Sequence, residues 1–230
     1  MYLGIDTSGA VTAGLVVSEH DAVTLEDDAP RRHVEHLVPF VTELLEQRGA
    51  SVRDLTGVVV GTGPAPFTGL RVGLVTARVL GLSLGVPVWG VPSPDALAEA
   101  AVRAGVDDDG QPLLVVTDAR RREVYWSRYE VRDGVAHRTA GPDVAAAADV
   151  PRTPDDVVLG SGRDLYPDVL GPAHPRVASR ALPGLHHPDP VMLVRIALRR
   201  HAAGEALPTD PLYLRRPDAV PPGAAKRVLA

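Results

Sequence analysis

The sequence feature that most constrains this chain is a ridge of small residues at every fourth position. The ridge consists of Gly69, Gly73, Ala77, Gly81 and Gly85. At roughly 100° per residue, these positions lie along one face of a helix. Glycine inside a helix costs about 1 kcal/mol relative to alanine. The ridge therefore predicts that another helix or a strand approaches this backbone closely.

The sequence also predicts where this helix begins and ends. An apolar run over residues 58–60 predicts a buried strand, and a turn rich in glycine and proline follows it. We expect the helix to begin at Thr68 or Gly69, with the Thr68 hydroxyl as its cap. Gly85, followed by Pro87, predicts the end of the helix.

The large apolar residues of this helix form two stripes instead of one. They are Leu70, Leu74, Leu80 and Leu84 beside the small residues, and Val72, Val75, Val79 and Leu82 on another side. A surface helix on a sheet needs only one apolar stripe. A second body must therefore cover this helix. That body is either the rest of its own domain or a partner subunit.

Composition excludes several classes of protein. The 230 residues suffice for one large domain or two small ones, and the 45% hydrophobic and 23% charged content is ordinary for a globular protein. The chain has no cysteine, which excludes disulfides and thiolate metal sites. It shows no run of about 18 apolar residues and no basic, then apolar, start. We therefore expect no membrane span and a cytoplasmic location.

The charge pattern argues against unassisted binding of nucleic acid. The net charge is −5, and the basic clusters at 31–32 and 120–122 are short and have acidic neighbours. A protein that binds nucleic acid alone usually carries a basic patch or stripe. A composite surface shared with a partner stays open.

Patterning along the chain predicts an α/β protein with two lobes, each a mixed sheet with a strand meander and helices. Strands are expected at 2–6, 11–18, 22–26, 58–61, 88–91, 112–117, 123–131, 135–139 and 157–159, and further helices at 33–48, 94–104 and 190–203. An acidic turn at 105–111 marks the boundary. We expect an N-terminal lobe over 1–105 and a smaller C-terminal lobe over 106–230, whose last helix and tail pack back on the first lobe.

Two short motifs could carry chemistry. Asp6, Thr7, Ser8 and Gly9 lie between two expected strands, where they would suit either a phosphate cradle or an ordinary hairpin turn. His33 and His36 are spaced i, i+3, whereas a helical zinc pair is spaced i, i+4. A third ligand is not evident nearby, so a solvated or interface pair is favoured over a metal site.

Several motifs together resemble the TsaB family, also called YeaZ, of the actin, sugar-kinase and Hsp70 ATPase (ASKHA) superfamily. These motifs are IDTS at 5–8, HVEHLVP at 33–39, GPAPFTGLRVG at 63–73, DAR at 118–120 and PLYLR at 211–215. The resemblance covers nearly the whole chain and is strongest before about residue 130. Ala65 and Pro66 stand where the family usually has Gly-Ser.

The resemblance implies an accessory role in tRNA modification. Family members are non-catalytic partners of TsaD, which transfers a threonylcarbamoyl group to the adenosine beside the anticodon. The ATPase TsaE joins the larger assembly, and some members form homodimers through the same surface. The resemblance implies no cofactor, no metal and no catalytic residue in this chain, and contact with tRNA only through the complex.

The resemblance and the helix pattern together place a partner interface on the first two helices. The expected interface residues are His33, His36, Leu37, Phe40, Leu44, Leu70, Arg71, Gly73, Leu74, Ala77, Arg78 and Leu82. Asp6 to Gly9 then form a degenerate phosphate loop. Two other hypotheses stay open: an autonomous ATP-binding kinase or ATPase of the same superfamily, and a metallopeptidase-like protein.

Overall fold

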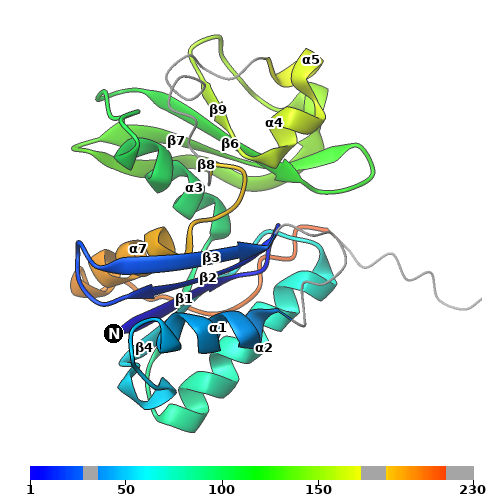
Figure 1. The fold of residues 1–230 in the computed structure, drawn as a ribbon. Coiled ribbons are helices and arrows are strands. Elements are labelled where there is room, and N and C mark those ends of the chain that lie inside the picture. Colours follow the sequence, from blue (N-terminus) through cyan, green and yellow to red (C-terminus); the bar gives the residue numbers. More distant parts are fainter. Residues whose placement is uncertain (28–35, 172–184, 216–230) are drawn as a thin grey trace, which may run out of the picture.

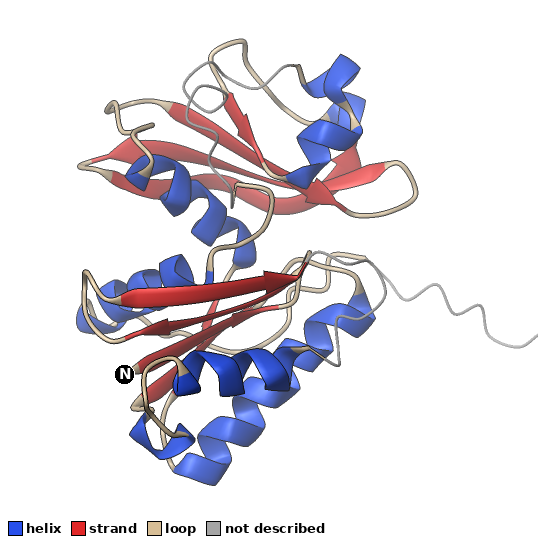
Figure 2. Ribbon diagram, in the orientation of Figure 1, coloured by secondary structure: helices blue, strands red, loops and turns tan. Residues whose placement is uncertain are grey.

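The chain folds around two β-sheets, which confirms the predicted α/β class with two mixed sheets. A computed structural model describes residues 1–27, 36–171 and 185–215. Figure 1 shows the two sheets one above the other, with helices on the outer faces and between them. Figure 2 shows the same view by element type.

The first sheet contains five strands in the order β3-β2-β1-β4-β5. Its strands are β1 (Tyr2–Asp6), β2 (Val11–Val16), β3 (Ala22–Asp27), β4 (Gly57–Gly61) and β5 (Val88–Val91). Strands β1 to β3 form an antiparallel meander, and β4 and β5 continue the sheet in parallel with β1. The parallel strands β1 and β4 therefore end at the same edge, where the candidate phosphate loop lies.

Helices cover both faces of the first sheet. Helices α1 (Leu37–Glu46) and α2 (Phe67–Leu84) pack on the face turned away from the second sheet, and α7 (Pro190–Ala202) packs on the other (Figure 1). Leu3, Ile5 and Val60 point towards α1 and α2, whereas Val59 points towards α7. This alternation along the strands gives the sheet one apolar core on each face.

The second sheet contains four strands in the order β8-β7-β6-β9. Its elements are β6 (Pro112–Asp118), β7 (Glu123–Arg132), β8 (Val135–Ala146), β9 (Val157–Leu159), and the short helices α4 (Ser161–Leu165) and α5 (Pro167–Leu170). The described residues also include two short 3-10 helices, Val52–Asp54 and Ala147–Asp149. Leu170 of α5 packs in the core on one face of this sheet.

Helix α3 (Ser93–Arg103) lies between the two sheets and packs against both lobes (Figure 1). Leu97 and Ala101 belong to the core of the second sheet, while Ala96 packs with α7. Two buried carboxylates on the same helix, Asp95 and Glu99, also bind neighbouring elements. Helix α3 is therefore the joint between the lobes.

Charged hydrogen bonds fix α3 in place. Asp95, which is buried, accepts bonds from the Tyr129 hydroxyl at 2.7 Å and from Arg200 Nη2 at 2.8 Å. Glu99 accepts two bonds from Arg199, at 2.6 and 3.2 Å. Buried carboxylates are stable only with such partners. Helix α7 and strand β7 are thus bonded to the same connecting helix.

The small-residue ridge of α2 packs against the chain's own first sheet. A Cβ atom added to Gly73 would lie 2.6 Å from Thr7 Oγ1, and one added to Gly81 would lie 2.1 Å from Val88 Cγ2. Both distances are far below van der Waals contact, so these positions need glycine. The predicted close approach is made by Thr7 at the end of β1 and by Val88 of β5. The ridge therefore faces the chain's own first sheet. Gly85 ends the helix in a left-handed conformation with φ 67°, as expected.

Several element boundaries differ from those predicted. Helix α1 begins at Leu37, and the expected start at residue 33 lies outside the described residues. Helix α2 begins at Phe67, one residue before Thr68, so Thr68 is not its cap. Strand β8 continues to Ala146, seven residues beyond its expected end at 139, because β7 pairs with it along that length.

Among the described helices, α2 is long and apolar enough to cross a membrane by length and composition alone. The sequence pattern predicts that no segment is long and apolar enough to span a membrane, and α2 differs from that expectation. Its buried positions, including Gly73 and Ala77, pack on the first sheet, and its flank carries Arg71 and Arg78. The apolar character of α2 therefore reflects one packed face and one exposed apolar face.

We predict that Gly73→Ala destabilises the protein although alanine favours helix. The added methyl group would displace the Thr7 hydroxyl, which accepts a hydrogen bond from Gly73 N and donates one to Gly69 O. Overpacking and the broken hydrogen bonds should cost about 1–3 kcal/mol more than the helix gains. Urea unfolding monitored by circular dichroism measures the change.

Ser83→Ala is the matched control, because Ser83 is exposed on the same helix. It should leave the unfolding free energy unchanged or slightly raise it. Gly73→Leu should prevent folding altogether. A Gly73→Ala protein as stable as the wild type would show that α2 does not need a glycine at this contact.

Candidate functional site

The candidate phosphate loop follows β1, and its first carboxylate is fully enclosed. Asp6 Oδ1 accepts hydrogen bonds from Ser8 N at 2.7 Å and Ser8 Oγ at 2.6 Å. Asp6 Oδ2 accepts a bond from Ser93 Oγ at 2.5 Å. Burial raises the pKa of Asp6, and the hydrogen bonds from Ser8 and Ser93 oppose that effect. Both carboxylate oxygens are thus engaged by side chains of the chain itself.

The next residue of the loop is also used in packing. Thr7 Oγ1 donates a hydrogen bond to Gly69 O at 2.9 Å and accepts one from Gly73 N at 3.2 Å. The Thr7 side chain therefore fastens the end of β1 to the first turns of α2. Asp6 and Thr7 stabilise the fold in this arrangement, which leaves Ser8 and Gly9 as the part of the loop that faces outward.

Ser8 and Gly9 border a cavity of about 540 Å³ between the lobes. Its other polar lining comes from Thr117, Asp118, Arg120, Ser161, Asp164, His186 and His187. These charged groups pair with one another: Arg120 Nη1 lies 3.1 Å from Asp118, and His186 Nδ1 lies 2.9 Å from Asp164. The cavity could admit a small polar molecule, but its charges already have protein partners.

The glycines after β9 are explained by packing. A Cβ atom added to Gly160 would lie 2.3 Å from Val116 O, and one added to Gly162 would lie 3.1 Å from the same atom. Gly160 also has φ 92°, which side chains rarely adopt. These residues begin α4 directly beside β6. The close approach to β6 accounts for both glycines without a nucleotide.

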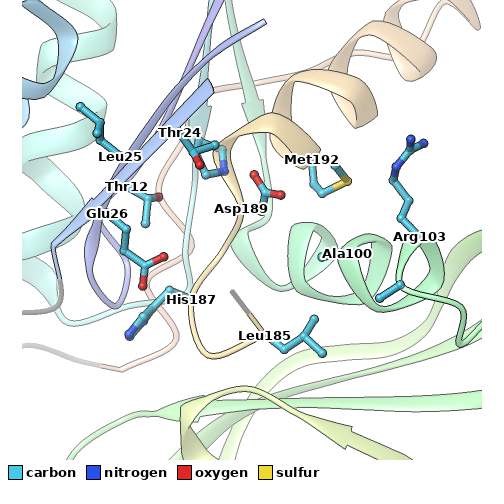
Figure 3. Close-up of a pocket in the computed structure, with 12 residues that line it drawn as sticks. Thr12, Thr24, Leu25, Glu26, Ala100, Arg103, Leu185, His187, Asp189 and Met192 are labelled. Carbon is cyan, nitrogen blue, oxygen red and sulfur yellow. The ribbon is translucent and has the colours of Figure 1, made fainter. Parts of the chain in front are cut away.

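A second cavity of about 430 Å³ lies between β2, β3, α3 and the start of α7. Figure 3 shows its lining, which combines Thr12, Thr24 and Met192 with the charged side chains of Glu26, Arg103 and Asp189. Asp189 Oδ1 accepts a bond from Val191 N at 2.8 Å and so caps α7. Burial raises the pKa of Asp189. The Asp189 carboxylate therefore has a structural role as the N-cap of α7.

The structure does not bring the expected histidines into a metal site. His36 pairs with Asp27 and lies beside the ring of Phe40, while His33 lies outside the described residues. Within residues 1–27, 36–171 and 185–215, no group of three or more metal-ligating side chains occurs. In this part of the chain, His36 has the role of a paired surface histidine.

The outer faces of α1 and α2 form an exposed apolar surface, which we call the helix face. It consists of Val38 on α1 and Val75, Val79 and Leu82 on α2. Leu82 is 87% exposed, and the other three are 56–64% exposed. Val75, Val79 and Leu82 are spaced i, i+4 and i+7 and so share one side of α2, and clustered exposed apolar side chains are typical of binding surfaces.

This geometry corrects the expected interface residues. Six of them lie in the core of the first lobe and cannot contact a partner from there: Leu37, Leu44, Leu70, Gly73, Leu74 and Ala77. Gly73 and Ala77 belong to the small-residue ridge, Leu70 and Leu74 lie beside it, and Leu37 and Leu44 are on the inward face of α1. Of the others, Arg71, Arg78 and Leu82 are exposed, and His36 and Phe40 are partly exposed.

Residues that the sequence prediction missed are Val38, Val75 and Val79, and the buried partner Ser93. Val75 and Val79 belong to the second apolar stripe, so the helical pattern contained the necessary signal. It did not indicate which stripe faces outward. The pairing of Ser93 with Asp6 joins positions 87 residues apart, which no local pattern reveals.

Comparison with known proteins finds one matching family model and several similar proteins. The family model described as "TsaD: tRNA N6-adenosine threonylcarbamoyltransferase" matches residues 25–159. An uncharacterised protein of Mycobacterium tuberculosis is 45% identical over 226 residues, which cover 95% of this chain and 93% of that protein. The Bacillus subtilis "tRNA threonylcarbamoyladenosine biosynthesis protein TsaB" is 31% identical over 180 residues, covering 74% of this chain and 76% of the relative.

Solved structures agree in fold over more than nine tenths of the chain. YeaZ from Pseudomonas aeruginosa superposes with a TM-score of 0.74 at 25% identity, covering 92% of this chain and 99% of that one. A second Pseudomonas aeruginosa structure, of a protein "with similarity to peptidase YEAZ", has the same TM-score at 28% identity and covers 93% and 99%.

We predict that Asp6 makes the stability of this protein fall as pH rises. Because its folded pKa is raised above 3.8, the folded state holds the proton more tightly than the unfolded state. The contribution is complete below pH 3.8 and is lost as pH rises through the folded pKa. A difference of one pKa unit between the two states corresponds to about 1.4 kcal/mol. The unfolding free energy of wild type minus that of Asp6→Asn should therefore decrease between pH 4 and pH 7.

Asp54→Asn is a control of opposite sign. Hydrogen bonds from Ser51 N and Ser51 Oγ lower the pKa of Asp54, which is exposed. Its stabilising contribution is therefore present at neutral pH and is lost as pH falls. A wild-type minus Asp6→Asn difference that grows with pH would mean that the buried site prefers the Asp6 anion.

Proposed function

The chain belongs to the TsaB (YeaZ) family of the ASKHA superfamily, and on that premise we propose that it is a non-catalytic subunit that pairs with a TsaD-type threonylcarbamoyl transferase. Through that pairing it would support the formation of threonylcarbamoyladenosine next to the anticodon of tRNA. The name of the Bacillus subtilis relative and the description of the matching family model support this role.

The helix face is the observation that carries the proposal. Val38, Val75, Val79 and Leu82 lie on adjacent helices and leave apolar side chains in solvent. These helices lie on the outermost layer of the first lobe, away from the second sheet (Figure 1). Two helices with an apolar outer face suit a partner that adds its own helices to form a bundle.

The loop after β1 supports a non-catalytic role. An ATPase of this superfamily needs a carboxylate that can organise a metal ion and its water. Here the Asp6 carboxylate is fully buried and bonded to Ser8 and Ser93. Thr7 is bonded to the backbone of α2. These contacts favour a docking subunit over an autonomous kinase or ATPase.

The partner interface is accordingly revised. We propose that Val38, Val75, Val79 and Leu82 form its centre, with Arg71, Arg78 and Phe40 at its border. The proposal also includes a TsaE-like ATPase in the larger assembly, homodimers through the same face in the absence of the transferase, and action in the cytoplasm.

We predict that the double substitution Val79→Asp and Leu82→Asp abolishes co-purification with the cognate TsaD-type protein. Two carboxylates at the centre of an apolar interface would be buried without partners, and each should weaken binding at least about tenfold. The fold should persist, because both side chains already face solvent. Affinity is measured by co-purification and titration, and folding by circular dichroism.

Leu165→Asp is the matched control, since Leu165 is 53% exposed on α4 in the other lobe. It should bind the transferase normally. If the α2 variant also binds normally and supports tRNA modification in a reconstituted assay, the helix face is not the interface. If the wild-type chain neither binds the transferase nor supports modification, the proposed function itself is wrong.

A further inference from the structure

Two arginines without a carboxylate partner line one cavity of the first lobe. Arg103 lies in the last turn of α3, and Arg195 lies in the middle of α7. Both border a cavity of about 350 Å³ at the end of the first sheet where β1 begins and β2 ends. In the part of the chain that the structure describes, neither guanidinium group forms an ion pair.

The other arginines of α7 show how this helix normally compensates its charges. Arg199 and Arg200 pair with buried carboxylates on α3, at 2.6 and 2.8 Å. Arg195 instead donates from Nη2 to the backbone oxygen of Glu19 at 2.7 Å, and its Nε is enclosed without a hydrogen-bond partner. The contact between α3 and α7 is therefore neutralised at one end and leaves two guanidinium groups uncompensated at the other.

The nearby carboxylates do not bind these two arginines. Burial and the neighbouring Arg103 guanidinium lower the pKa of Arg195, while Asp189 and Glu19 oppose that effect. Asp189 is already engaged as the N-cap of α7, and Glu19 is exposed at the edge of the cavity. Arginine remains charged at neutral pH. The cavity thus keeps positive charge that no carboxylate contacts directly.

The other walls of the cavity are mostly apolar. They come from Val16 and Val17 around the end of β2, Leu198 on α7 and the side chain of Tyr2. Val17 is 44% exposed, so a ligand can reach this wall. The Tyr2 ring is held by stacking on Trp89, with 5.8 Å between the ring centroids. An apolar wall with a few polar groups is typical of a small-molecule site.

This cavity is separate from the helix face. Its α7 residues lie on the side of the first sheet that faces the second sheet, whereas α1 and α2 lie on the opposite side (Figure 1). Figure 3 shows the Arg103 side chain extending from α3 towards α7. A partner bound to the helix face would leave the cavity accessible, so the inference does not depend on the proposed function.

We propose that this cavity binds a small organic carboxylate whose charge is held by Arg103 and Arg195. Its hydrocarbon or aromatic body lies against Val17, Leu198 and the ring of Tyr2. Guanidinium groups match the two oxygens of a carboxylate and are weakly hydrated, so they can bind one beside apolar side chains. Inorganic phosphate would leave the apolar wall unused, and a neutral apolar molecule would leave the arginines uncompensated.

The test compares benzoate with two probes that each lack one of its features, using ligand-observed NMR on the full chain. Benzyl alcohol has a similar apolar body without the charge, and inorganic phosphate, measured by its displacement of benzoate, has charge without the body. Benzoate should bind with an affinity of about millimolar, as expected for a ligand of its size. It should bind about tenfold more tightly than either other probe, and more weakly as salt is added.

Two substitutions of exposed side chains should change the affinity for benzoate in opposite directions. Arg103→Gln removes one guanidinium group and should weaken binding about tenfold. Glu19→Gln removes the carboxylate at the edge of the cavity and should strengthen binding about twofold. Arg53→Gln is the matched control, because Arg53 is also exposed and forms no ion pair among the described residues, but it does not line this cavity. Urea unfolding shows that each variant keeps the wild-type stability.

Four results would overturn the inference. They are a wild-type chain that does not bind benzoate, equal affinity for benzoate and benzyl alcohol, phosphate that binds as tightly as benzoate, and an Arg103→Gln variant with wild-type affinity. A purely structural role for Arg103 predicts no change in affinity for a folded variant. Opposite changes in Arg103→Gln and Glu19→Gln, with none in Arg53→Gln, are expected only if the charge of the cavity holds the ligand.

Discussion

The end of β1 is the point on which the rest of the structure depends. Thr7 bonds to the backbone of α2 at Gly69 and Gly73, and a Cβ atom at Gly73 would lie only 2.6 Å from Thr7 Oγ1. Asp6 bonds to Ser93 at the start of α3, and Ser93 N donates to Gly63 O at 2.9 Å. Thr7 thus fastens α2 to the end of β1, and the adjacent Asp6 fastens α3, the helix that joins the lobes, to the same point.

This arrangement supports the proposed non-catalytic role of a chain with a fold of the ASKHA superfamily. A phosphate loop must leave its carboxylate and hydroxyl groups available to the nucleotide and metal. Here burial and hydrogen bonding commit Asp6 and Thr7 to packing. We propose that the first lobe instead binds other molecules through the outward stripe of α2. The same helix therefore needs glycine on its inner side and keeps exposed valines and Leu82 on its outer side.

Sequence patterning predicted the element order, both sheets and the close approach at the small-residue ridge. It could not tell which body approaches, because a strand and a partner helix demand the same small residues. Exposure of Val75 and Val79 depends on how α2 is rotated on the sheet, which long-range contacts decide. The bonds between Asp6 and Ser93, and between Glu99 and Arg199, join distant positions. The left-handed conformation of Arg120–Arg122, in the turn between β6 and β7, contradicts local preference, so no propensity could indicate it.

The C-terminal segment connects the two lobes. Arg78 on the flank of α2 donates to Thr209 O at 2.7 Å and to Thr209 Oγ1 at 3.0 Å, and Arg71 binds Tyr213. The same segment reaches the second lobe through Arg215, which donates to Ala119 O. A partner that covers the outer face of α2 would therefore also lie beside this segment, which bonds to the flank of the helix through Arg71 and Arg78.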